Sequence, residues 1–151
     1  MMTLMNVVRL MLVTNSGKGN KLKNMDSKLK MNQPADLDSA VSFLVENFFD
    51  DKDKKAIEEL TESQFVGRTH HMIGRAIRND WYLWWNKDHA FDMWPKEQPT
   101  IVKFFNDLNI HHADDMSGII LTSVYRRLQN QELKLDNQVQ EYIEYWKNNL
   151  M

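Results

Sequence analysis

Apolar residues recur at intervals of three and four positions along most of the chain after residue 34, a spacing typical of amphipathic helices. The first helix is expected over 37–49, with Asp36 available as its cap. A charged turn at 50–55 should then lead to a short helical stretch around 56–60. No alternating strand pattern competes with the helical pattern in this part of the chain.

A longer helix is expected next, opened by a capping box between Thr61 and Gln64. It should end near Asn79 and Asp80, because both residue types favour turns and caps. One side of this helix is apolar, formed by Phe65, Thr69, Met72, Ile73, Ala76 and Ile77. We therefore expect it to lie at the centre of the fold.

Three more helices are predicted in the second half of the chain. Pro99 suits the first turn of a helix that ends at 109–111. Asp114 or Asp115 can cap the next helix, whose apolar residues cover most of its circumference, so it should be buried. Asp136 is expected to cap the last one, whose apolar stripe is Val139, Tyr142, Ile143, Trp146 and Leu150. The predicted fold class is all-α: a compact, irregular bundle of five to six helices in a single domain.

The first 33 residues differ in character from the rest. Residues 1–33 carry six Lys and Arg against one Asp, whereas residues 34–151 carry thirteen against twenty acidic residues. The sequence therefore predicts a flexible basic leader at 1–33, rich in Lys, Asn, Ser and Gly, and a helical domain at 34–151. Met31 directly precedes the first patterned element, so an extended start is one explanation of the leader. A basic arm that touches an acidic partner is the other.

Composition excludes several classes of protein. A chain of 151 residues is long enough for one domain with a real core. It has no cysteine, which excludes disulfides and thiolate metal sites and fits a cytoplasmic location. A net charge of −2 makes nucleic-acid binding an unlikely role. The apolar run at 1–13 is too short to span a membrane as a helix.

The stretch 68–86 mixes basic, polar and aromatic side chains more densely than any other. On a helix, its basic residues form one stripe opposite the apolar side: Arg68, His71, Arg75 and Arg78. Gly67 and Gly74 leave a notch beside which His70 lies. The stripe could bind a phosphate or an acidic peptide. Alternatively it is a solvated face, or its arginines pair with Asp114 and Asp115; we expect one arginine to be paired and another exposed.

Three tryptophans follow this helix at Trp81, Trp84 and Trp85. They could stack on a ligand ring. Packing in the core is the favoured alternative, because large aromatic side chains are buried on average.

A second candidate cluster combines His111 and His112 with Asp114 and Asp115. Imidazole and carboxylate ligands suit Mn, Fe or Zn. Ala113 interrupts the adjacent His-Asp pair of helical metallophosphohydrolases, and both aspartates could instead serve a helix N-terminus. We expect no tightly bound metal, and we predict that Arg78 lies within ion-pair distance of one of these aspartates, with Trp84 beside them.

Several of these residues also form an ordered pattern. It comprises His70 or His71, Gly74, Ile77-Arg78-Asn79, Leu83-Trp84, His112-x-Asp114-Asp115-x-Ser117 and Ile119-Ile120. Over residues 36–130 the chain resembles a small all-helical domain family of bacteria and phages. The resemblance implies a single helical domain and no established activity, so it assigns no catalytic residue.

The sequence favours a non-enzymatic helical module that binds another protein, in a regulatory or phage–host role. The candidate binding residues are Arg68, His70, His71, Arg75, Arg78, Asn79, Trp84, His112, Asp114 and Asp115. No catalytic residue, cofactor or metal ligand is predicted, and the oligomeric state is left open. The alternative is a small metal-dependent hydrolase that uses His112, Asp114 and Asp115.

Overall fold

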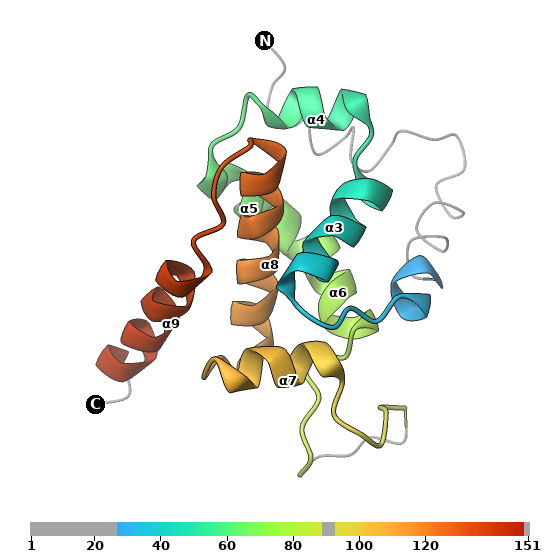
Figure 1. Cartoon of the computed structure of the whole chain (residues 1–151), viewed down its shortest axis with the longest axis vertical. Coiled ribbons are helices and arrows are strands. Elements are labelled where there is room, and N and C mark those ends of the chain that lie inside the picture. The colour runs from blue at the N-terminus through green and yellow to red at the C-terminus, as the bar shows by residue number, and fades with distance from the viewer. Residues whose placement is uncertain (1–26, 89–92, 150–151) are drawn as a thin grey trace.

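A computed structural model describes residues 27–88 and 93–149 of the chain (Figure 1). Its α-helices are α3 (Leu37–Phe48), α4 (Asp51–Ile57), α5 (Glu62–Thr69), α6 (Arg75–Asp80), α7 (Thr100–Asp107), α8 (Ala113–Leu128) and α9 (Leu135–Asn149). The π-helical turn η1 (His70–Gly74) joins α5 directly to α6. The described ranges contain helices, turns and loops but no strand, so the predicted all-α class is confirmed.

Capping residues set where the first helices begin. Asp36 and Ser39 form a capping box at the start of α3, and Thr61 and Gln64 form one at the start of α5. Both starts were expected. The predicted charged turn at 50–55 is wrong, because Asp50 caps the helix α4, which carries these charges.

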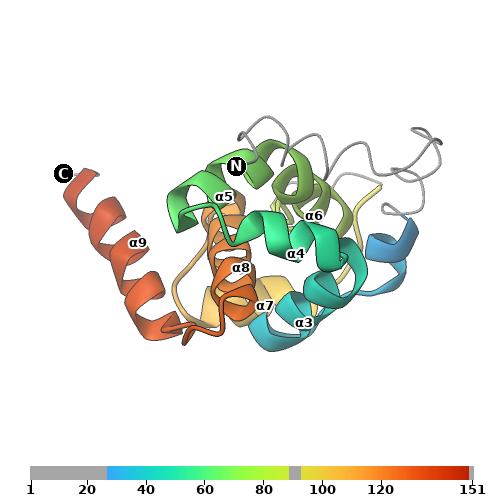
Figure 2. The ribbon, with the colours of Figure 1, turned by 90° about the horizontal axis from the view of Figure 1, so that it is seen from above.

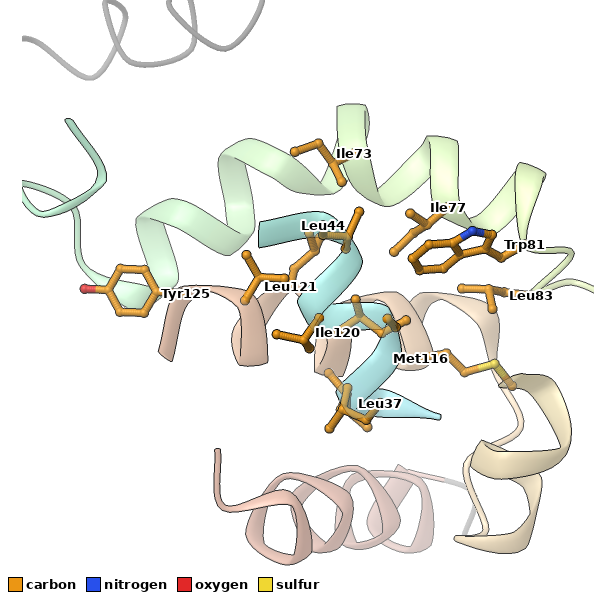
Figure 3. Close-up of a cluster of buried hydrophobic side chains, with 14 of the residues drawn as sticks. Leu37, Leu44, Ile73, Ile77, Trp81, Leu83, Met116, Ile120, Leu121 and Tyr125 are labelled. Atoms are coloured by element: carbon orange, nitrogen blue, oxygen red, sulfur yellow. The ribbon is translucent and has the colours of Figure 1, made fainter. Parts of the chain in front are cut away.

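The core lies where α8 packs against both α3 and the rod formed by α5, η1 and α6 (Figure 3). Ile120 and Leu121 of α8 are fully buried with Leu44 of α3 and Ile77 of α6. Burying an aliphatic side chain of this size stabilises a fold by about 1.5–3 kcal/mol. The prediction of a buried central α8 is confirmed.

Two predicted caps are wrong, and Pro99 lies one position before the first turn in which it was expected. α8 is capped by His112, and Asp114 and Asp115 lie inside its first turn. α9 begins at Leu135, so Asp136 is likewise a first-turn residue. Pro99 occupies the N-cap position of α7. Aspartates inside a first turn still interact favourably with the helix dipole, which is why the sequence pattern placed the helices correctly.

Residues 27–33, which the sequence assigns to the leader, pack against the end of α6. Leu29 is fully buried, and its carbonyl accepts a hydrogen bond from Trp81 Nε1 at 3.0 Å. Gln33 Nε2 donates to the Asp80 carbonyl at 3.0 Å. These contacts make residues 27–33 part of the folded domain. The rest of the predicted leader, at 1–26, lies outside the described residues.

Helix α9 lies on the outside of α8, on the side away from α3 (Figures 1 and 2). Its buried side chains are those of Gln138 and Val139, both near its start. Further along, Tyr142 and Ile143 are half-buried, and Trp146 is exposed. The predicted stripe therefore packs only in part. None of the helices in the described ranges is both long and apolar enough to cross a membrane.

Candidate functional site

The central helical rod widens into a π turn at η1, next to the residues that the sequence singled out. A π turn inserts extra backbone and often marks a functional position. Here Arg78 folds back along the rod, and its Nη2 donates to the His70 carbonyl at 3.1 Å. Gly74 makes this possible, because a Cβ at that position would lie 2.9 Å from Arg78 Nη1 and 3.2 Å from Leu121 Cδ1. The guanidinium thus fills the space beside Gly74, whereas a Cβ at Gly67 would have nothing within 4 Å, so the two glycines do not form the predicted shared notch.

Arg78 connects the rod to the first turn of α8. Its Nη1 donates to Ser117 Oγ at 2.9 Å, and its Nε lies 3.4 Å from Asp114 Oδ1. The residue is only 6% exposed, so these partners replace water around its charge. The predicted ion pair between Arg78 and one of the two aspartates is confirmed.

His70 supplies a second acceptor to the same guanidinium. Its Nδ1 lies 3.4 Å from Arg78 Nη1, and an arginine always donates, so Nδ1 must be unprotonated in this contact. Burial and the charge of Arg78 lower the pKa of His70. His70 is therefore held in its neutral form.

The predicted basic stripe does not form as a single surface. Arg78 is buried, whereas Arg68, His71 and Arg75 are exposed. Because η1 adds backbone within the turn, residues beyond it rotate relative to those before it. One arginine is paired and another is exposed, as expected. Asn79 is also exposed and lies apart from the Arg78 contacts.

Aromatic rings gather at the N-terminus of α8. His112 Nδ1 accepts a hydrogen bond from the Asp114 backbone N–H at 3.2 Å. The His112 ring lies 5.7 Å from the Trp84 ring and 5.8 Å from the Trp146 ring, measured between centroids. Trp81 is buried as expected, but Trp84 is 43% exposed, so core packing is the wrong prediction for Trp84.

The far side of this site comes from α9. Trp146 Nε1 donates to Asp115 Oδ2 at 2.7 Å and bridges the two helices. Beside the bridge lies a hollow of about 520 Å³, here named the α8–α9 groove. It is lined from α8 and its cap by His112, Asp114 and Asp115, and from α9 by Glu141, Tyr142, Tyr145 and Trp146.

A second hollow of about 480 Å³, here named the apolar hollow, adjoins the groove. The two share His112, Asp115 and Trp146. The remaining lining of the apolar hollow is Asn109, Ile110, His111 and Ile143. An elongated ligand could therefore occupy both hollows at once.

The α8–α9 groove is electronegative. Three carboxylates line it, and its lining contains no lysine or arginine. Burial raises the pKa of Tyr142, and the charges of Asp115 and Glu141 raise it further. The Tyr142 hydroxyl also lies against Gly118, where a Cβ would come within 2.5 Å of it. Gly118 thus lets α9 approach α8 closely.

The metal-dependent hydrolase hypothesis needs several ligands that converge on one point. In the part of the chain that the structure describes, no group of three or more His, Asp or Glu side chains could hold a metal ion. His112 Nδ1 caps α8, Asp114 faces Arg78, and Asp115 accepts from Trp146. The geometry therefore does not favour the hydrolase alternative.

Comparison with known families shows to which family the chain belongs. The family model described as a domain of unknown function (DUF6794) matches residues 33–128. The chain belongs to the DUF6794 family. Comparison with curated proteins and with solved structures gave no match.

The DUF6794 match includes the Arg78 contacts and the α8 wall of the groove, whereas α9 lies beyond it. Six candidate residues meet at this site: His70, Arg78, Trp84, His112, Asp114 and Asp115. The α9 residues Glu141, Tyr142, Tyr145 and Trp146 were missed as site residues. For Tyr142 and Trp146 the signal in the sequence was an apolar stripe that also carries phenol and indole groups, which suit a wet surface as well as a core. Glu141 and Tyr145 lie outside that stripe.

Proposed function

We propose that this DUF6794 domain binds another protein through the α8–α9 groove. The observation that carries the proposal is a set of three exposed aromatic side chains: Tyr145 and Trp146 line the groove, and Trp84 packs against its wall residue His112. Exposed tryptophan and tyrosine are enriched where proteins bind one another, because they bury large areas at low entropic cost. An enclosed catalytic pocket is not needed for this function.

The supporting contacts favour a preformed surface. Arg78 contacts Ser117, the His70 carbonyl and Asp114. A rearrangement of the first turn of α8 would break these contacts and therefore cost free energy. The Trp146–Asp115 hydrogen bond fixes the opposite wall. A surface that is already ordered loses less entropy when a partner binds.

The exposed residues Arg68, His71 and Arg75 offer a second surface for a partner. They lie on α5, η1 and α6, and they do not belong to the lining of the groove. A surface of this kind steers acidic partners but contributes little affinity by itself. We therefore rank it below the groove.

Selection from a displayed random-peptide library on the immobilised full chain tests the proposal. Peptides selected on the wild type should lose binding to the Trp146→Ala and Trp84→Ala variants. The double variant Arg68→Ala/Arg75→Ala should retain it. Loss of binding in the double variant alone would transfer the function to the basic surface, and selection of no peptide at all would count against a protein-binding role.

The sequence also led us to expect a regulatory or phage–host role in the cytoplasm. Those expectations stay predictions. Selected peptide sequences would sharpen them, because they would identify the chemistry of the partner.

A further inference from the structure

The lining of the α8–α9 groove determines which chemical group can enter it. Glu141 and Tyr145 are exposed on α9, and the Asp114 side chain is 46% exposed on α8. Asp114 Oδ1 lies 3.4 Å from Arg78 Nε, and Asp114 Oδ2 lies 3.8 Å from His112 Nδ1. The groove therefore retains carboxylate oxygens that an incoming cation can reach.

Aromatic faces accompany these carboxylates. The Tyr145 and Trp146 rings lie 5.4 Å apart in an edge-on arrangement, and both line the groove. A cation over an aromatic face is attracted by the electrons of the ring, and a guanidinium can also stack on it. Carboxylates combined with exposed aromatic rings suit the side chain of arginine, or of lysine, better than a neutral or anionic group.

The apolar hollow distinguishes a peptide from a free small cation. It lies directly across the shared residues Asp115 and Trp146, and Ile110 and Ile143 contribute to its lining. A polyamine has no apolar branch to place there. A peptide has one wherever a bulky apolar residue stands next to a basic one.

We infer that the partner is recognised through a short segment in which an arginine or lysine lies next to a bulky apolar residue. The basic side chain enters the α8–α9 groove, and the apolar side chain enters the apolar hollow. This inference rests on the proposed function and adds the chemical class of the bound segment.

Titration of the full chain with a capped Ser-Arg-Leu-Ser peptide, up to millimolar concentration, tests the inference. The readout is the NMR signal of the Trp146 indole N–H, which lies between the two hollows. We expect saturable shifts and about fivefold weaker binding when citrulline, the neutral isostere, replaces arginine. Replacing leucine by serine should also weaken binding severalfold.

Two variants of α9 give a matched comparison. Glu141→Gln should weaken the arginine peptide about threefold, as expected for loss of one partly screened charge. Glu144→Gln makes the same chemical change on the same helix, outside the groove lining, and should leave the affinity unchanged.

Three outcomes would overturn the inference. The first is equal affinity for the arginine and citrulline peptides, and the second is the absence of saturable shifts. The third is spermidine binding as tightly as the peptide, which would assign the groove to small cations. If library peptides without basic residues still bind the groove, the proposed function stands and only this inference fails.

Discussion

The two ends of α8 use the same kind of ion pair to different effect. At the C-terminal end, Arg126 forks onto Glu62 of α5, with distances of 2.7 and 3.2 Å from Nε and Nη2 to the two carboxylate oxygens. Arg127 Nη2 lies 2.7 Å from Asp38 Oδ1 of α3. Two arginines therefore meet two carboxylates, and the charges balance.

At the N-terminal end of α8 the charges do not balance. There Arg78, which is buried, pairs with Asp114. Asp115 and Glu141 add two more carboxylates. The charges at both ends of α8 are favourable to its dipole, because aspartates lie in the first turn and arginines in the last turn. We propose that this excess of carboxylates makes the N-terminal end a binding surface, whereas the balanced end only connects helices.

Removal of Arg78 should have the largest effect on stability. Arg78→Ala leaves Ser117 and the His70 carbonyl without their donor, and we expect a loss of about 3 kcal/mol in the free energy of unfolding. Urea denaturation at pH 7 measures it. Combined with Asp114→Ala the losses should be non-additive, and combined with Asp115→Ala they should add. Additivity in both cycles would contradict the network.

The corresponding change at the other end should cost less. Arg126 is half-buried, and Arg126→Ala removes the fork to Glu62 and the 2.6 Å hydrogen bond to the Leu133 carbonyl. We expect about 1–2 kcal/mol, because water can reach the groups left behind. The same denaturation series measures it. A loss as large as that of Arg78→Ala would remove the contrast between the two ends.

The contact between Gly118 and Tyr142 tests how α9 packs on α8 beside the groove. Gly118→Ala should not stabilise the wild type, because its Cβ would come within 2.5 Å of the Tyr142 hydroxyl and displace α9. In a Tyr142→Phe background the clash is relieved, and alanine should stabilise the helix by about 0.5–1 kcal/mol. Equal effects of alanine in the two backgrounds, measured by urea denaturation, would mean that α9 does not pack here.

The smallest expected effect is a pH dependence of stability that arises from His70, near the N-terminal end of α8. His70 faces Arg78, His71 and Asp114, and its folded pKa is lowered from 6.5, first by burial and then by Arg78. The unfolded chain therefore takes up the proton first. The stability that neutral His70 contributes is present above pH 6.5 and is lost as the pH falls through the folded pKa.

His70→Gln keeps an acceptor but does not titrate. Between pH 7.5 and 5.5, the melting temperature of the wild type should therefore fall more than that of the variant. The change in each melting temperature across this range, compared between the two proteins, checks the prediction. Parallel curves would show that His70 does not couple to Arg78.

Local patterns predicted much of the fold. The capping boxes at Asp36 and Thr61 and the all-round apolar α8 follow from residues close in sequence. The Arg78–Asp114 pair was also predictable, because both helix ends and the small residues between them were visible. Sequence patterns within one helix predict the structure correctly where the residue type, such as a cap or an all-round apolar face, fits only one kind of position.

The remaining features depend on contacts that no local pattern encodes. The π turn at His70–Gly74 moved Arg78 off the predicted stripe. Leu29 lies in a polar segment, yet its buried side chain and the hydrogen bonds of Leu29 and Gln33 to the end of α6 dock that segment. Trp146 reads as a core residue from its spacing, but it is 37% exposed and lines the α8–α9 groove. These outcomes depend on tertiary packing.

The most direct test of the account compares Asp115→Asn with Glu62→Gln in the full chain. Both changes remove one carboxylate charge, at opposite ends of α8. For each variant, the melting temperature and the affinity for the Ser-Arg-Leu-Ser peptide are measured together. We expect Asp115→Asn to weaken the peptide severalfold with little change in melting temperature, since asparagine can still accept from Trp146. Glu62→Gln should lower the melting temperature by about 2–4 °C and leave the affinity unchanged. If instead both variants changed affinity and stability alike, the two ends of α8 would not have separate roles.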